Sequence, residues 1–449
     1  MSVVTVQLGQ CGNQIGGQLF STIIDDIHAK LSSVHVPPNK NKDYMKEVID
    51  RFFIEKDEKG TSVLQAKAVM VDMEPKAIAQ TCVEARRSGT WMYPEKQQFC
   101  QKRGSGNNWA HGFCVHGPRV QADIMEMVRR EVEKSDRLAG FLSLMSLAGG
   151  TGSGVGARIT ESLRDEFPHS FIVNQVVWPY QTGEVIVQNY NAVLTLSHLY
   201  QTSDAVVVLE NDSLQKICSQ LLNMKKISFR DINKVIAHKL ASFLLPATSE
   251  DGGYSNSNDL GFLLQHLVPH PEYKLLSLRN IPQIAEKSME FSVYQWHGLL
   301  KHLRQMLIAN AAMEEGIDWD VQAGSETPRG TTRYNRSLAN TLILRGKDID
   351  TANCAPFSER KLYADWVPAD CRLCVMKQPR AFGQYEKSAV LVSNSSSSLG
   401  SMDQMVGKAW NMFASRAYVH QYVKHGLTEE DFLNSFVTLE QVIASYKNL

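Results

Sequence analysis

A glycine-rich run, AGGTGSG at residues 148–154, constrains this chain more than any other segment. An apolar stretch typical of a strand precedes the run at residues 141–147, and a helical pattern follows at residues 155–166. Glycine at this density lets backbone N–H groups turn toward an anion, and the positive end of the following helix points to the same place. The pattern predicts a phosphate-binding loop in which the hydroxyls of Thr151 and Ser153 are additional donors.

Two other kinds of phosphate loop do not fit this run. A Walker loop continues with a lysine and a serine or threonine after its last glycine, whereas Gly154 is followed by Val155 and Gly156. A dinucleotide fingerprint has the spacing Gly-x-Gly-x-x-Gly and an acidic residue about twenty positions later, whereas the spacing here is Gly-x-Gly-x-Gly. A glycine-rich loop without a ligand is the alternative that the motif alone leaves open.

The composition predicts a soluble, intracellular protein of two or three domains. With 449 residues, the chain is too long for one compact domain. Its 47 basic and 47 acidic residues balance, so we expect no nucleic-acid partner and no anionic membrane surface. The sequence has no apolar run long enough for membrane insertion, no signal-peptide pattern, and no small-domain disulfide spacing among its eight cysteines.

The first 210 residues alternate short apolar runs with helical stretches, which predicts a parallel sheet with crossover helices and hence the α/β class. Polar residues and glycines follow each strand candidate, at the carboxyl ends where open α/β sheets bind ligands. The strand candidates are residues 2–8, 66–71, 141–147, 171–177 and 205–209.

Changes of pattern predict three domains. These are a nucleotide-binding domain at residues 1–213, a mixed α/β intermediate domain with a core helix at residues 214–394, and a C-terminal helical hairpin at residues 395–449. The hairpin is expected to restart at a capping pair, Thr428 and Asp431. Residues 31–59 are polar and contain prolines, and we expect an exposed loop there.

Several side chains near the strand ends suit a nucleotide with its metal ion. Gln10 and Gln14 carry amides that can bond phosphate oxygens or a metal-bound water, although surface glutamines are equally compatible. Asp72 and Glu74 supply carboxylates of the kind that Mg²⁺ prefers. A solvated loop is the alternative for this pair.

Further along, Asn107 lies in a second turn of small residues and can reach the phosphates. Asn211 and Asn233 offer donor and acceptor atoms that suit the edge of guanine. Phe229 precedes Asn233 by one helical turn and can stack on a base, although a core position is the commoner role for such a residue.

The order and spacing of six motifs resemble the tubulin superfamily over essentially the whole chain. The resemblance implies a tubulin-like fold that binds GTP (or GDP) and Mg²⁺. It assigns the metal to Glu74 and Asp72, with Gln10 nearby. It assigns the nucleotide to Gly9, Gln10, Cys11, Gln14, Asn107, Ser146, Gly149, Gly150, Thr151, Gly152, Ser153, Gly154, Gln188, Asn211, Phe229 and Asn233. The motifs are GQCGNQIG (9–16), VDMEP (71–75), GSGNNWA (104–110), AGGTGSG (148–154), QNYN (188–191) and LVPHP (267–271).

Three departures make the chain most similar to the δ-tubulin family. It has QNYN at residues 188–191 where α- and β-tubulins have EPYN, it has an insertion after the first helical stretch, and it ends without an acidic tail. The δ family is associated with centrioles, basal bodies, cilia and triplet microtubule walls. The resemblance therefore implies a cytoplasmic, cytoskeletal protein at these structures, with tubulin-family proteins or centriolar components as partners.

The resemblance also bears on hydrolysis. In this family, a loop of one subunit supplies an aspartate and, three residues later, a glutamate to the nucleotide of the next subunit. The corresponding residues are Asp259 and Phe262, and a phenyl ring cannot orient or deprotonate water. Asp259 is thus the remaining catalytic candidate, and weak or absent GTPase activation is expected. A self-assembling GTPase, an adaptor for tubulin or ciliary regulators with an idle nucleotide and, more remotely, a nicotinamide oxidoreductase are the alternatives.

Overall fold

The computed structural model describes residues 1–30, 34–58, 61–183, 185–249, 259–285, 288, 294–325 and 334–449. The chain divides into two compact units. The first comprises Met1–Ser21, Ile49–Asn211 and Leu399–Ser445, and the second comprises Thr22–Val48, Asp212–Ser398 and Tyr446–Leu449.

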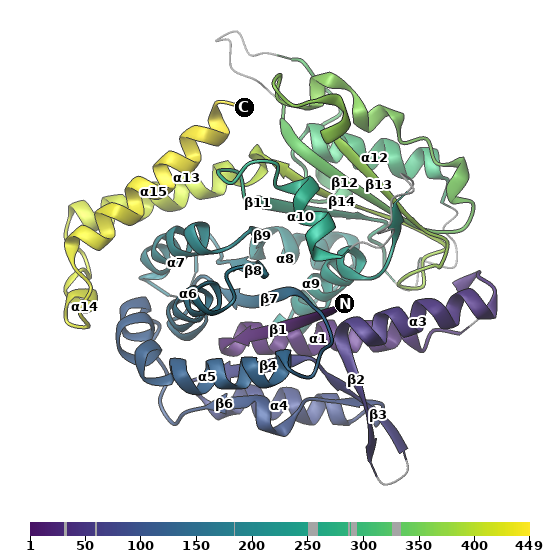
Figure 1. Ribbon diagram of the computed structural model, residues 1–449. Helices are drawn as coiled ribbons and strands as arrows, with labels where there is room; N and C mark the ends of the chain where they lie inside the picture. The colour runs from purple at the N-terminus through teal and green to yellow at the C-terminus, as the bar shows by residue number, and fades with distance from the viewer. Residues whose placement is uncertain are drawn as a thin grey trace. The chain divides into compact units, whose positions relative to one another are not determined.

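The first unit is built on a parallel sheet with the strand order β9-β8-β7-β1-β4-β6 (Figure 1). All 7 residues of β1 are buried, as expected for a parallel strand covered on both faces. The five predicted strands are confirmed, with shifts of up to three residues at their ends. They are β1 (Ser2–Leu8), β4 (Ala68–Asp72), β7 (Leu138–Ser146), β8 (Phe171–Trp178) and β9 (Ala205–Glu210), and the edge strand β6 (Gln98–Cys100) was not predicted.

Helices connect these strands, so the predicted α/β class is confirmed. Among them, α5, α6 and α7 lie in a row (Figure 1). Each strand that leads into a helix leaves its polar loop at the carboxyl edge of the sheet. The helices are α1 (Gly9–Ile27), α4 (Pro75–Arg86), α5 (Gly117–Val132), α6 (Gly156–Glu166) and α7 (Gln188–Thr202).

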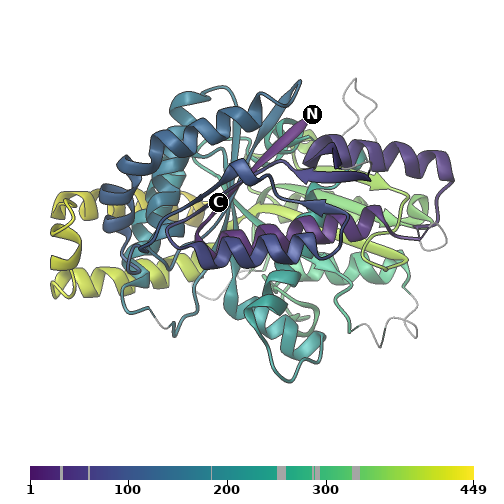
Figure 2. The same cartoon turned by 90° about the horizontal axis from the view of Figure 1, so that it is seen from below.

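The predicted C-terminal helical hairpin is also confirmed. Helices α13 (Leu399–Ala414) and α15 (Glu429–Lys447) lie side by side in both views, and the short α14 (His420–Val423) lies between them in the sequence (Figure 1 and Figure 2). The ring of Trp410 meets that of Phe436 at 5.2 Å between centroids. The N–H of Asp431 donates to Thr428 Oγ1 at 3.2 Å, which is the expected cap of α15.

The expectation of an exposed loop at residues 31–59 is wrong for the part that the structure describes; residues 31–33 and 59 lie outside it. The segment forms α3 (Pro38–Phe52) and β2 (Phe53–Glu58), and β2 pairs antiparallel with β3 (Thr61–Ala66). A small sheet with the order β2-β3-β5 results, in which β5 is Trp91–Met92.

The helix forms because a buried stripe runs through this polar sequence. Asn41, Tyr44, Val48 and Phe52 recur three or four residues apart, and all four are buried. Pro38 is the first residue of the helix, where its missing N–H costs little. The expectation of a loop gave more weight to the polar composition and the prolines than to this helical spacing of buried residues.

The second unit contains a mixed sheet with the order β10-β13-β12-β14-β11. Only the β12–β13 pair among these is parallel. None of the helices in the described part of the chain is long and apolar enough to cross a membrane. The elements are α8 (Asn211–Lys216, shared with the first unit), α9 (Phe229–Leu244), α10 (Leu260–Leu267), α12 (Trp296–Ile308), β10 (Thr248–Ser249), β11 (Leu275–Ile281), β12 (Ser337–Gly346), β13 (Leu373–Gln378) and β14 (Lys387–Ser395). The division into three domains stays a prediction.

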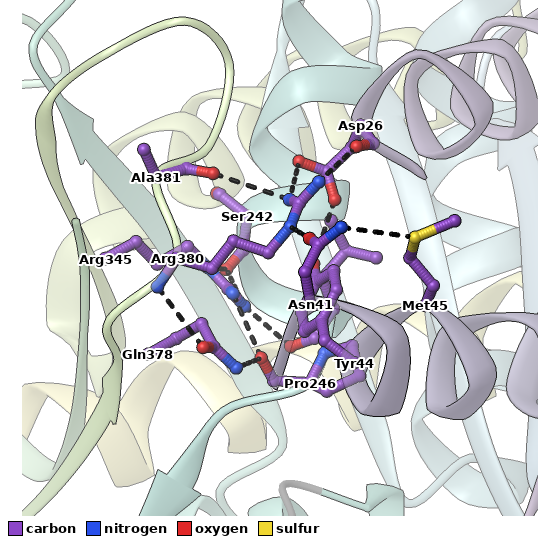
Figure 3. A network of polar contacts seen from close by, with 11 residues as sticks. Asp26, Asn41, Tyr44, Met45, Ser242, Pro246, Arg345, Gln378, Arg380 and Ala381 are labelled. Atoms are coloured by element: carbon purple, nitrogen blue, oxygen red, sulfur yellow. Dashed lines mark hydrogen bonds and ion pairs between the residues drawn. The ribbon is translucent and has the colours of Figure 1, made fainter. Parts of the chain in front are cut away.

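A buried arginine joins three segments of the second unit (Figure 3). Arg380, between β13 and β14, places Nη1 2.7 Å from Asp26 Oδ1 and donates from Nε to Asn41 Oδ1 at 2.8 Å. Its guanidinium carbon lies 4.6 Å from the centre of the Tyr44 ring. Tyr44 in turn donates to Asp26 Oδ2 at 2.9 Å. The network fixes the ends of α1 and α3 against this loop.

Candidate nucleotide-binding site

Two helix N-termini meet at the glycine run. Helix α1 begins at Gly9, directly after β1, and the run forms a wide helical turn (Thr151–Val155) that continues into α6. Gly9 has φ +70°, and a Cβ atom placed there would lie 2.8 Å from Gly152 N. Because only glycine allows both this conformation and this approach, the first turns of the two helices lie in backbone contact. The positive ends of both helices converge there, together with the N–H groups of their first turns, which favours an anion.

The turn at residues 104–109 packs against the same run. A Cβ atom on Gly150 would lie 2.7 Å from both Asn108 N and Ser105 Cβ, so the two backbones are in contact. Ser105 Oγ lies 3.3 Å from Thr151 Oγ1. Three loops that are distant in the sequence therefore form one surface at the carboxyl edge of the sheet.

Asn107 and Gly149 are brought together at this surface. Among the described residues other than its two chain neighbours, only Asn107 places an atom (Oδ1, at 3.9 Å) within 4 Å of a Cβ on Gly149. Asn107 itself has φ +53°, a left-handed conformation that asparagine tolerates better than most residues. Two predicted phosphate-binding positions thus border open space.

Two of the predicted hydroxyls have partners inside the run. Ser146 Oγ accepts from Ala148 N at 3.2 Å, and Ser153 Oγ donates to the carbonyl oxygen of Gly149. These bonds fix the shape of the loop. The backbone N–H groups, rather than these hydroxyls, are the principal anion donors that the geometry offers.

The predicted amides and thiol of the first loop lie on the first turns of α1. Gln10 is exposed and Gln14 is partly buried. Burial raises the pKa of the Cys11 thiol to about 12, so this side chain is a neutral contact group and not a nucleophile.

The predicted carboxylate pair lies at the end of β4. Burial, with a smaller contribution from the neighbouring Glu74 carboxylate, raises the pKa of Asp72 to about 6, against hydrogen bonds from the backbone that lower it. A Cβ atom on Gly104 would lie 2.4 Å from Glu74 Oε1, so the glycine makes room for this side chain. A desolvated carboxylate beside a second one is stabilised by a cation.

Among the described residues, no group of three or more His, Cys, Asp or Glu side chains is arranged to hold a metal ion. Two carboxylates completed by phosphate oxygens and water are the usual protein contribution to a Mg²⁺ site. The residues present therefore fit magnesium that arrives with a nucleotide.

Gln188 and Asn211 lie at the starts of α7 and α8. Gln188 Nε2 donates to the Tyr180 carbonyl at 2.8 Å, which holds the preceding loop. Gly183 allows this packing, because a Cβ atom there would lie 1.9 Å from Gln188 Oε1. Asn211 follows β9 directly and is partly buried.

Phe229, Asn233 and Asp259 belong to the second unit. Phe229 opens α9 and is 62% exposed, which excludes the core role and leaves its ring free to stack, whereas Asn233 one turn later is buried. Asp259 caps α10: its Oδ1 accepts from the N–H of Phe262 at 2.7 Å. The predicted catalytic carboxylate thus has a structural partner.

Sequence reasoning missed Asn191 as the centre of the first unit's loops. Its side chain is wholly buried, and Nδ2 donates to the carbonyl oxygens of Asn107 at 2.8 Å and Ala148 at 2.7 Å. Oδ1 accepts from Trp109 N at 3.0 Å and from Tyr422 Oη at 2.6 Å. The only available signal was its place in the QNYN motif, which does not reveal such distant partners.

Asn13, also missed, has a similar role in the first loop. Its side chain is wholly buried. Nδ2 donates to the carbonyl oxygens of Gly9 at 2.9 Å and Val71 at 3.0 Å. The first loop is thereby tied to β4 at the residue before Asp72.

Comparisons with known proteins agree with this geometry. The family model described as "Tubulin/FtsZ family, GTPase domain" matches residues 2–219. The chain is 52% identical over 458 residues to the Tubulin delta chain of Macaca fascicularis and 53% identical over 458 residues to that of Canis lupus familiaris, covering 100% of each chain in both cases. The Tubulin beta-1 chain of Geotrichum candidum is 26% identical over 455 residues, which cover 99% of this chain and 94% of that one. The resemblance predicted from the motifs is confirmed.

Proposed function

The chain belongs to the tubulin family of GTP-binding cytoskeletal proteins, and we propose that it acts in the assembly of centrioles or basal bodies, with their triplet microtubules, and of cilia. The observation that best supports nucleotide binding is the contact between Gly9 and Gly152, where two helix N-termini converge. Full-length similarity to Tubulin delta chains supports the cellular part, together with tubulin-family proteins or centriolar components as partners.

In this proposal each group of residues has one task. Backbone N–H groups of Gly9, Gln10 and residues 149–153 bind phosphate oxygens, and Gly154, whose own N–H donates to the Gly150 carbonyl at 2.9 Å, closes the turn. Asp72 and Glu74 hold Mg²⁺, which would neutralise phosphate charge. Asn211 and Asn233 bond the guanine edge, Phe229 stacks on the base, and Gln188 reaches the ribose. Cys11, Gln14, Asn107 and Ser146 line the same ligand.

We expect GTP to be structural rather than rapidly turned over. Phe262 occupies the position of the water-activating glutamate, and the capping bond engages one oxygen of Asp259. Because a carboxylate retains further acceptor sites beyond one such bond, a self-assembling GTPase is the second candidate. GTP retained without conversion to GDP by the purified chain favours the structural role, and steady release of GDP favours the second candidate.

The phosphate site is tested by a matched pair of glycine substitutions. Of the part of the chain that the structure describes, only Asn107 Oδ1, at 3.9 Å, lies near the new methyl group in Gly149→Ala, and no atom lies within 4 Å of it in Gly407→Ala, at an exposed position of α13. Both variants should fold, but only the first places a methyl group in the proposed ligand space. We expect GTP affinity to fall about tenfold or more in Gly149→Ala and to stay unchanged in Gly407→Ala. Equal affinities would refute phosphate binding at the run.

The cellular part requires separate tests. Co-sedimentation with α/β-tubulin at defined stoichiometry distinguishes a lattice subunit from an adaptor that binds free tubulin. A tagged chain should concentrate at centrioles or basal bodies. A uniform distribution in cells that contain these structures would refute that part and leave the nucleotide site untouched.

A further inference from the structure

Residues 421–425 of the C-terminal hairpin contact the elements that form the nucleotide loops. Tyr422 Oη donates to Asn191 Oδ1 at 2.6 Å. The adjacent Gln421 carbonyl accepts from Asn108 Nδ2 at 3.2 Å. His425 stacks on His111, with 4.5 Å between ring centroids and 23° between the ring planes. Gln421 and His425 thus join this segment to residues 108–111, at the end of the turn that packs on the glycine run, and Tyr422 joins it to Asn191.

Asn191 makes these contacts interdependent. A primary amide has two N–H donors and two principal acceptor sites, and all four are used, by Asn107, Ala148, Trp109 and Tyr422. Loss of the Tyr422 bond therefore disturbs the same side chain that holds the carbonyls of both nucleotide loops. Buried polar networks of this kind are rigid when every member is satisfied and loosen when one is not.

The turn needs this support. Gly106 and Asn107 have φ +59° and +53°, so two consecutive residues are left-handed. For asparagine this conformation is less favourable than the right-handed one and persists where surrounding contacts fix it. The bond from Asn191 Nδ2 to the Asn107 carbonyl is such a contact.

We infer that the C-terminal hairpin controls nucleotide retention, with Asn191 and Tyr422 as positioning residues. A protein that binds the hairpin and shifts residues 421–425 changes the affinity of the loops for nucleotide. Because coupling between two sites is reciprocal, nucleotide binding changes the affinity of the hairpin for that protein by the same factor. The inference rests on the proposed binding of GTP and adds a route by which a protein bound to the hairpin senses or sets the nucleotide state.

Tyr422→Phe tests the coupling, because it removes one hydroxyl and keeps the ring. Tyr190→Phe is the matched control: Tyr190 is also buried and packs edge-to-face on Tyr422 at 5.5 Å, but its hydroxyl donates to the Ala417 carbonyl at 2.9 Å and not to the Asn191 side chain. Both variants lose one buried tyrosine hydroxyl bond in the same cluster. They differ in whether the lost bond leads to the nucleotide loops.

Two quantities are measured on the full chain, the dissociation rate of GTP and hydrogen exchange of residues 415–426 with and without GTP. We expect GTP to slow exchange in this segment of the wild-type chain. In Tyr422→Phe, dissociation should be about two- to tenfold faster, the effect of one hydrogen bond, and the protection by GTP should shrink. Tyr190→Phe loses its bond to Ala417, so exchange in this segment should rise equally with and without GTP, while its rate of GTP dissociation and its protection by GTP should match the wild type. A merely structural role for Tyr422 would lower stability without moving the GTP-dependent part of the exchange.

The possible results distinguish a failure of the coupling from a failure of nucleotide binding. If the wild-type chain binds GTP but exchange in residues 415–426 does not respond, or both variants behave alike, the coupling is refuted and the nucleotide site stands. If the wild-type chain takes up no GTP, the proposed function fails and the coupling fails with it.

Discussion

Replacing Arg380 by methionine should destabilise the second unit far more than an equivalent change at the surface. The Arg380 and Asp26 side chains are 1% and 3% exposed, and their charged atoms lie 2.7 Å apart. Methionine retains much of the aliphatic stem but leaves the Asp26 carboxylate buried with the Tyr44 hydroxyl and without this guanidinium. The stacking of Arg380 on Tyr44 is lost as well.

The size of the destabilisation follows from the burial of the Arg380–Asp26 ion pair. Removing one partner of a buried, hydrogen-bonded ion pair costs about 3–5 kcal/mol, because the remaining charge is uncompensated. Arg86 and Glu95 provide the control, since their atoms lie 2.6 Å apart but the side chains are 50% and 78% exposed. Exposed pairs of this kind contribute about 0–1 kcal/mol. Arg86→Met should therefore be nearly neutral.

Native-state hydrogen exchange of α3 is the suitable assay, because a chain of two units need not unfold in one transition. Opening of α3 should become about two hundred to several thousand times more frequent in Arg380→Met, the factor that about 3–5 kcal/mol corresponds to, and change little in Arg86→Met. Adding Asp26→Asn to Arg380→Met should restore part of the protection, because the buried charge is then gone. Equal effects of Arg380→Met and Arg86→Met, or a double variant worse than Arg380→Met, would refute the reasoning.

Three further predictions concern titration and turnover. Burial and the neighbouring His111 lower the pKa values of His116 and His425. Below about pH 6.5, these histidines bind protons more readily in the unfolded chain than in the folded one. The melting temperature of the first unit should therefore fall as the pH is lowered from 7.5 to 5.5. Burial lowers the pKa of Lys239 to about 7, so stability should rise with pH above 7, and Lys239→Met should flatten that rise in urea titrations at pH 7 and 9. Phe262→Glu should increase GTP turnover in co-assembly with α/β-tubulin, and an unchanged rate, or strong stimulation by the wild-type chain, would contradict the assigned role of this position.

The central sheet could be predicted because its information is local. Each buried strand is an apolar run, and each carboxyl end is marked by glycine or polar residues within a few positions. The glycine run and the turn at 104–109 are recognisable for the same reason. Helix α3 was missed because its apolar stripe at Tyr44, Val48 and Phe52 is diluted by charged residues that face solvent.

The connections that hold the site together were not predictable in this way. Asn191 meets partners that are 43, 82, 84 and 231 residues away in the chain. No period or local motif encodes contacts of that separation. The sequence therefore identifies which loops bind the ligand, and only the fold reveals which buried side chains set the shape of those loops.

Buried asparagines also explain how the loops present donors to an anion. The amides of Asn13 and Asn191 occupy the carbonyl oxygens of Gly9 and Ala148. In a planar trans peptide the carbonyl and the N–H of the following residue point in opposite directions. Fixing these two carbonyls toward the protein interior therefore turns the N–H groups of the next residues, Gln10 and Gly149, the other way, toward the predicted phosphate position. Glycine allows the loops to approach, and the asparagines determine which side of each peptide faces the ligand.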